Sequence, residues 1–305
     1  MFDCIVSLTS WTKRINNPIL LEVLDSVVKQ ETKYNFHIVF VLSLEEFPKR
    51  EDNLPQALVT FIKNNGIELL WTKENLKAYK KLYPVQKKYP ELPIMTMDDD
   101  IVLEPTCIET FMDEHRNNPK CILSEGGRIF SPDGETLTGI FRLYPPHSVL
   151  EVDPLYFKYW FQNCEDDAYL AILAWAKDTQ TKILKTQLAK EIKNTELTIS
   201  ALRNQYRKID NKLCKIHLLQ ALKRMGILKK SIEPIIERFK NELLEKERQR
   251  KLREERLKEL RLKREKEKEQ RLKEINAVPE KLKRLQVVKP ISVQNRYRRL
   301  RQNAK

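Results

Sequence analysis

The chain has 305 residues, of which 41% are hydrophobic and 33% are charged, and its formal net charge at pH 7 is +14. The charge is uneven, because residues 1–182 carry a net charge of −7 and the remainder carries +21. No apolar run approaches the roughly 20 residues that span a bilayer, and neither cysteines nor histidines show zinc-ligand spacing. These features exclude a membrane-spanning protein and a zinc-finger protein, and we expect a cytoplasmic chain.

Residues 1–180 alternate between strand and helix signals. Short apolar or β-branched runs predict buried strands, and apolar residues three and four positions apart predict helices. This alternation predicts a mostly parallel sheet with helices on both faces, the α/β class. In chain order the predicted elements are strand 4–8, a helix that begins at Asn17-Pro18, strand 36–42, helix 54–64, strand 67–71, helix 76–89, strand 93–97, helix 105–117, strand 121–123 and helix 168–175.

From residue 184 the pattern changes. Apolar residues step by four and three positions from Leu188 to Ile216, and this 3.5-residue period predicts a coiled coil or a long helical hairpin. Residues 235–275 consist mainly of Glu, Lys, Arg and Leu, with pairs such as Glu269/Lys273, and predict an exposed helix stabilised by its charges. The predicted divisions of the chain are 1–182, 183–232 and 233–305, with a disordered basic end.

Three consecutive carboxylates, Asp98, Asp99 and Asp100, follow the predicted strand 93–97. In open parallel sheets, ligands bind beyond the carboxyl ends of the strands. Neighbouring carboxylates repel one another, and Mg²⁺ typically joins one or two carboxylates to substrate phosphates. A solvated acidic turn is the alternative, which the apolar residues on both sides of the motif disfavour. The position of the motif therefore suggests a divalent-cation site.

A second acidic cluster, Glu165-Asp166-Asp167, precedes the predicted helix 168–175. Carboxylates in the first turn of a helix offset the helix dipole and cap free N–H groups. A carboxylate in this place can equally act as a general base toward a hydroxyl group. The position of the cluster alone does not decide between these two roles.

Five segments of the first 180 residues form a recognisable combination: VSLTSWTKRI (6–15), LSLEEFP (42–48), LPQAL (54–58), 77–82 and IMTMDDDI (94–101). Together they resemble a family of bacterial glycosyltransferases of the GT-A fold, similar to glycosyltransferase family 2 and common in surface-polysaccharide loci. The resemblance covers about residues 1–180 and implies a Rossmann-like sheet. It also implies transfer, with inversion, of a sugar from a UDP- or GDP-linked donor to a glycan or lipid-linked acceptor.

The resemblance assigns roles to individual residues. Asp100 would hold Mn²⁺ or Mg²⁺ against the diphosphate, and Asp98 would be a second metal ligand close to the ribose. Asp167, or else Asp166, would be the base that deprotonates the acceptor hydroxyl. The residues expected to contact the donor are Ser7, Leu8, Thr9, Arg14, Lys80 or Lys81, and Asp98.

Two other functions remain open on the sequence. A nucleotidyltransferase also carries strand-end carboxylates, although residues 7–17 contain no glycine for a phosphate loop. A degenerate transferase domain carried by a coiled coil would instead be a scaffold. For the tail we expect homo-oligomerisation through residues 184–220 and attachment of residues 235–301 to an anionic membrane surface. The acidic first part makes nucleic acid an unexpected partner.

Overall fold

The computed structural model describes residues 1–126, 141–152, 166–192 and 211–277. The chain divides into two compact units, Met1–Glu242 and Leu243–Lys305. Part of the predicted coiled coil (193–210) and the basic end (278–305) lie outside the described residues. Within the described part of the chain, no helix combines the length and the apolar character needed to cross a membrane.

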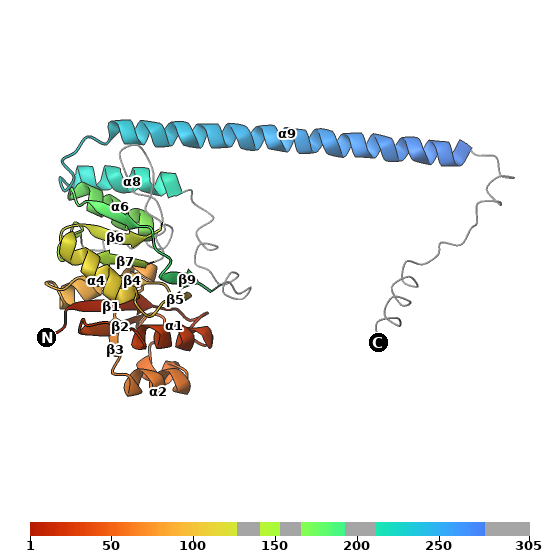
Figure 1. The fold of residues 1–305 in the computed structure, drawn as a ribbon. Coiled ribbons are helices and arrows are strands. Elements are labelled where there is room, and N and C mark those ends of the chain that lie inside the picture. Colours follow the sequence, from red (N-terminus) through yellow and green to blue (C-terminus); the bar gives the residue numbers. More distant parts are fainter. Residues whose placement is uncertain (127–140, 153–165, 193–210, 278–305) are drawn as a thin grey trace, which may run out of the picture. The chain divides into compact units, whose positions relative to one another are not determined.

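A seven-stranded sheet organises the first unit (Figure 1). The strand order is β3-β2-β1-β4-β7-β6-β8. Six strands run in one direction, and β7 runs against its neighbours β4 and β6, so the predicted mostly parallel α/β sheet is confirmed. The strands are β1 (Cys4–Thr9), β2 (Phe36–Ser43), β3 (Glu68–Thr72), β4 (Ile94–Met97), β6 (Ile122–Glu125), β7 (Phe141–Tyr144) and β8 (Thr181–Leu184), with β5 (Ile101–Leu103) and β9 (Ala189–Glu191) paired separately.

The helices follow the predicted order with one break. The predicted helix 76–89 is divided into a 3-10 helix and a short α-helix, because Lys77 has a left-handed φ of 54° and Pro84 fits only the first turn of a new helix. The helices are α1 (Ile19–Val28), η1 (Arg50–Asn53), α2 (Gln56–Asn64), η2 (Lys77–Lys81), α3 (Tyr83–Lys88), α4 (Cys107–Asn117), α6 (Asp166–Ala176), α8 (Asn211–Arg224) and α9 (Glu233–Ala277).

The two faces of the sheet are both buried but differ in chemistry. Alternate residues of each strand point to opposite faces. On one face, strand residues such as Val6 and Phe40 join apolar residues of α1, α2 and α4 in the main hydrophobic core. On the other face, buried polar residues such as Ser7, Thr96 and Arg142 alternate with those core residues. This second, polar face leads toward the acidic motifs.

Residues 181–191 correct the prediction of a coiled coil that begins near residue 184. They form β8, which pairs with β6, and β9, which pairs with β5. Leu188 and Ile192, the first two positions of the apolar repeat, lie on either side of β9 and pack against the hydrophobic core of the sheet instead of forming a coiled-coil seam. A sequence pattern cannot distinguish the two cases until the pairing strands are known.

The helix α9 continues from the first unit into the second. From Leu244 to Glu274 every residue is exposed, and residues 243–277 contain 14 basic and 9 acidic side chains. Lys273 Nζ lies 3.0 Å from Glu269 Oε1, one of the expected i,i+4 pairs. The predicted long, charged helical tail is therefore confirmed over these residues.

Candidate active site

The triple aspartate lies at the edge of the sheet where β1 and β4 end. These two strands are parallel, and Leu8 pairs with Met97. Asp98, Asp99 and Asp100 follow directly and form the turn between β4 and β5. The carboxylates therefore occupy the strand-end position in which α/β sheets bind ligands.

Asp99 fastens this acidic turn to the segment after β1. Its Oδ2 accepts a hydrogen bond from Ser10 Oγ at 2.6 Å, and its Oδ1 lies 2.5 Å from Arg14 Nη1. The same guanidinium nitrogen lies 2.9 Å from Asp100 Oδ2. Arg14, which the resemblance placed in contact with the donor, is thus held by two carboxylates. Asp99, which the sequence left without a role, is the anchor of the turn.

The second acidic cluster meets the first through Lys81. The Lys81 ammonium lies 2.5 Å from Asp98 Oδ1 and 3.1 Å from Asp166 Oδ2. The Lys81 side chain is 5% exposed, whereas that of Asp98 is 52% exposed and open to a ligand. The fold therefore joins two clusters that lie about 65 residues apart in the sequence.

Arg142 is a buried cation that sequence reasoning missed. It lies on β7 beside Thr96 of β4, and its side chain is 3% exposed. Its Nη1 lies 2.7 Å from Asp167 Oδ1 and 3.5 Å from Tyr144 Oη. A charged residue inside the apolar run Phe-Arg-Leu-Tyr was the available signal, since a buried guanidinium requires an acidic partner.

Lys80 and Lys81 point to different partners. Lys80 Nζ lies 2.8 Å from Glu46 Oε2 and 3.2 Å from Asn75 Oδ1, and its side chain is 1% exposed. Burial lowers the pKa of Lys80, against the attraction of Glu46. Of the two lysines that the resemblance offered as donor contacts, Lys81 is the one that reaches the acidic motifs.

The other expected donor contacts lie around the end of β1. Ser7 is fully buried, and Leu8 belongs to the hydrophobic core, so its side chain faces away from the polar face. Thr9 is 9% exposed and donates a hydrogen bond from Oγ1 to the Val41 carbonyl oxygen at 2.6 Å. Among these three residues, Thr9 lies nearest the open strand end.

The surroundings shift the pKa values of the three aspartates in different directions. Burial, together with the neighbouring Asp98 and Asp99 charges, raises the pKa of Asp100 to about 6, although Arg14 opposes the rise. Burial also raises the pKa of Asp99. For Asp98, the partial loss of water around the carboxylate is outweighed by the Lys81 ammonium, which holds the pKa of Asp98 below its usual value. An additional positive charge near Asp100 would therefore be stabilising.

The charges of the site leave room for a divalent cation. Among the described residues, five carboxylates lie here (Asp98, Asp99, Asp100, Asp166 and Asp167), against three paired cations (Arg14, Lys81 and Arg142). Two negative charges remain, which is the charge that one Mg²⁺ or Mn²⁺ would neutralise. The described residues contain no ready-made group of three metal-ligating side chains. A cation bound here would therefore need its other ligands from substrate phosphates and water.

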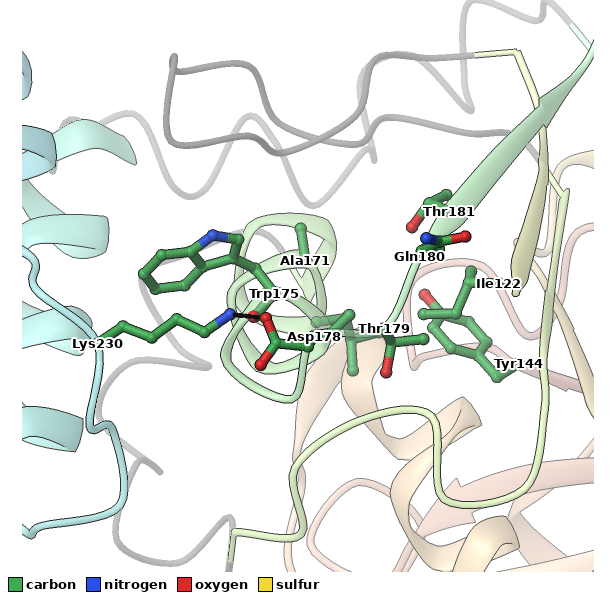
Figure 2. A pocket seen from close by; sticks show the side chains of 11 residues that line it. Ile122, Tyr144, Ala171, Trp175, Asp178, Thr179, Gln180, Thr181 and Lys230 are labelled. Atoms are coloured by element: carbon green, nitrogen blue, oxygen red, sulfur yellow. Dashed lines mark hydrogen bonds and ion pairs between the residues drawn. The ribbon is translucent and has the colours of Figure 1, made fainter. Parts of the chain in front are cut away.

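A cavity of about 380 Å³ lies at the opposite edge of the sheet (Figure 2). Its walls include Ile122 at the start of β6 and Tyr144 at the end of the antiparallel β7, whereas the acidic turn follows the end of β4. On its other side Lys230 donates a hydrogen bond to the Trp175 carbonyl oxygen at 2.6 Å and pairs with Asp178. The cavity contains none of the residues predicted for the active site.

Removing the Arg142 charge is expected to destabilise the protein. Arg142→Met would leave Asp167 without its buried partner, and loss of one member of such a pair costs about 2–4 kcal/mol. Arg142→Lys should cost less, because it retains a positive charge. Urea unfolding of both variants measures the difference, and equal stability of Arg142→Met and the wild type would contradict the pairing.

Comparisons with known proteins give similarity in fold only. No protein-family model and no curated protein sequence matches the chain. A crystal structure of S. aureus TarS 1–349 aligns with a TM-score of 0.44 and 11% identity, covering 76% of both chains. Its complex with UDP-GlcNAc aligns with a TM-score of 0.43 and 11% identity, covering 72% of both. Against another TarS structure, the chain spans 42% of the TarS length.

A second kind of protein aligns equally well. A putative glucose-1-phosphate thymidylyltransferase from Bacillus anthracis, crystallised with sucrose, gives a TM-score of 0.43 and 9% identity. This alignment covers 68% of the present chain and 96% of the other.

Proposed function

We propose that the chain is a metal-dependent glycosyltransferase of the GT-A type, which moves a sugar from a nucleotide-sugar donor to a hydroxyl acceptor. One observation carries the proposal. The Asp98–Asp100 turn and the Asp166–Asp167 pair meet at the carboxyl edge of the sheet, joined by Lys81. A strand-end acidic turn suits a donor diphosphate, and a nearby second carboxylate pair suits an acceptor hydroxyl.

The donor side would be built on Asp98 and Asp100. Asp98 is half-exposed, and Asp100 carries a raised pKa that a cation would lower again. Mn²⁺ or Mg²⁺ held by these carboxylates would neutralise the departing nucleoside diphosphate. Asp99, fixed by Ser10 and Arg14, would keep both ligands in place without contacting the metal.

The acceptor side would be built on Asp167. Arg142 engages Asp167 Oδ1, which fixes the orientation of the carboxylate. The side chain is 25% exposed, so an acceptor hydroxyl can approach it. A carboxylate held in a fixed orientation is suited to accept the hydroxyl proton in an inverting displacement. Asp166, held by Lys81 and 14% exposed, is the second candidate.

Hydrolysis of a panel of UDP- and GDP-sugars in the presence of Mn²⁺ tests this function. We expect slow release of UDP or GDP from one member of the panel, because water can take the place of the acceptor hydroxyl when no acceptor is present. Release of pyrophosphate from a sugar phosphate and a nucleoside triphosphate would instead identify a nucleotidyltransferase. Nucleotide binding without turnover of any sugar donor would favour a scaffold.

We also propose that the exposed part of α9 attaches the enzyme to an anionic membrane surface, where a lipid-linked acceptor would be available. Residues 243–277 carry five more basic than acidic side chains. Each basic residue near an anionic surface contributes about 1 kcal/mol, screened by salt. We expect binding to phosphatidylglycerol vesicles at low salt and release at about 0.5 M NaCl, measured by co-sedimentation. Salt-independent binding, or none, would contradict this attachment.

We propose, third, that the chain self-associates through residues 184–220, of which the structure describes 184–192 and 211–220. On α8, Ile216 and Leu219 are buried within the first unit, while Leu213 is 39% exposed. The rest of the predicted coiled coil falls at 193–210, outside the described residues. Sedimentation equilibrium of the full chain tests the proposal. We expect an oligomer, and a monomer at micromolar concentration would contradict self-association.

A further inference from the structure

A single ammonium group serves both acidic clusters. Lys81 Nζ hydrogen-bonds Asp98 Oδ1 at 2.5 Å and lies 3.1 Å from Asp166 Oδ2. The two contacts are unequal, because Asp166 Oδ2 is buried and has no hydrogen-bond partner among the described residues. Asp166 therefore receives charge compensation from Lys81 but not a full hydrogen bond. Lys81 thus lies between two carboxylates and makes a hydrogen bond with only one of them, that of Asp98.

The backbone that carries Lys81 is fixed against the helix that carries Asp166. Lys81 is the last residue of η2, whose Tyr79 is buried and packs edge-to-face on Tyr169 of α6 with ring centroids 5.1 Å apart. The Lys81 side chain can change its torsion angles, but the Lys81 backbone cannot move away from α6 without breaking the Tyr79–Tyr169 ring contact. The ammonium is thus limited to positions near the two carboxylates.

The two carboxylates differ in access. The Asp98 side chain is 52% exposed, whereas that of Asp166 is 14% exposed. A cation arriving from solvent therefore reaches Asp98 first and competes there with the Lys81 ammonium. When Asp98 gains another positive partner, the ammonium is free to complete its hydrogen bond with Asp166.

We infer that Lys81 is a positioning residue that couples the two halves of the site, so that a cation at Asp98 transfers the Lys81 ammonium to Asp166. This inference rests on the proposed function, since it requires a cation on the donor side. It gives Lys81 a role opposite to that of a phosphate ligand. Lys81 would compete with the cation for Asp98. When the cation binds, the Lys81 ammonium would move to Asp166 on the acceptor side.

Titration of the full-length chain with Mn²⁺ alone, followed by electron paramagnetic resonance of the free ion, tests the coupling without measuring activity. Asp166→Asn should weaken Mn²⁺ binding by about three- to tenfold, because Lys81 then belongs to Asp98 alone. Asp167→Asn is the matched control: it removes the same charge one residue away, where Arg142 is the partner. We expect it to change the Mn²⁺ affinity by less than about twofold.

The same pair of substitutions in a Lys81→Gln background completes the test. Lys81→Gln should tighten Mn²⁺ binding, and Asp166→Asn should then differ little from Asp167→Asn. Lys77→Gln, on the same 3-10 helix, controls for loss of a nearby charge, and thermal unfolding checks that each variant folds. If Lys81→Gln does not fold, the difference in Mn²⁺ affinity between Asp166→Asn and Asp167→Asn still tests the coupling, and equal affinities would contradict it.

Two results would overturn this inference and leave the proposed function standing. One is an equal effect of Asp166→Asn on the Mn²⁺ affinity in the wild-type and Lys81→Gln backgrounds. The other is weaker UDP binding with unchanged Mn²⁺ binding in Lys81→Gln. If the wild type binds neither Mn²⁺ nor UDP, the proposed function fails as well. The two failures are therefore distinguishable.

Discussion

Asp100→Asn is expected to abolish Mn²⁺-dependent nucleotide binding and to stabilise the ligand-free protein at pH 7. Burial and the neighbouring carboxylates raise the pKa of Asp100 to about 6 from an ordinary value near 3.8. The folded state then binds more protons than the unfolded state between these two values. Stability is therefore lost as the pH rises through this window, by about 1–3 kcal/mol at neutral pH. The neutral amide removes this cost and also removes a metal ligand.

The pH dependence supplies the control for this variant. Urea unfolding should show the gain in stability at pH 7 and little gain at pH 4, where Asp100 is protonated in the wild type. The amide oxygen can still accept a hydrogen bond from Arg14, so the acidic turn should persist. Lower stability of Asp100→Asn at pH 7, or undiminished metal-dependent binding of UDP and GDP, would contradict the proposed role.

Asp167→Asn is expected to lower the rate of sugar transfer by about 10²- to 10⁴-fold, the usual effect of removing a general base. The amide cannot take a proton from the acceptor, but its oxygen can keep the hydrogen bond from Arg142. Nucleotide binding should stay within about twofold of the wild type, because the substitution changes the acceptor side and leaves the donor side intact. Release of UDP or GDP from the best donor of the panel measures the rate.

Asp166→Asn is the comparison for this prediction, because it changes the neighbouring carboxylate that faces Lys81. If Asp167 is the base, Asp166→Asn should retain more activity than Asp167→Asn. A larger loss in Asp166→Asn, with Asp167→Asn close to the wild type, would exchange the two roles. Equal activity of both variants and the wild type would place the base elsewhere.

The sheet and the position of the triple aspartate could be predicted because both depend on local patterns. Apolar runs such as 36–42 can only be buried, and Asp98–Asp100 end one of them. The antiparallel strand β7 could not be found in this way, since its four residues acquire their partners only through β4 and β6. Arg142 was missed with its strand.

The meeting of the two acidic clusters also lies beyond sequence pattern. Lys81 resembles its neighbour Lys80 in the sequence, and only the turn of η2 sends one toward Asp98 and the other toward Glu46. The different roles of the three consecutive aspartates could not be predicted from the sequence either. Asp99 has no distinguishing neighbour in the sequence, yet burial and the hydrogen bonds with Ser10 and Arg14 make it the anchor of the turn.

Calorimetric titration of the full-length chain with UDP and GDP, with and without Mn²⁺, tests the central claim most directly. The account predicts saturable binding of one nucleotide that requires Mn²⁺ and is reversed by EDTA, because Asp98 and Asp100 need the cation to hold a diphosphate. Binding of neither nucleotide, or equal binding with and without Mn²⁺, would contradict it.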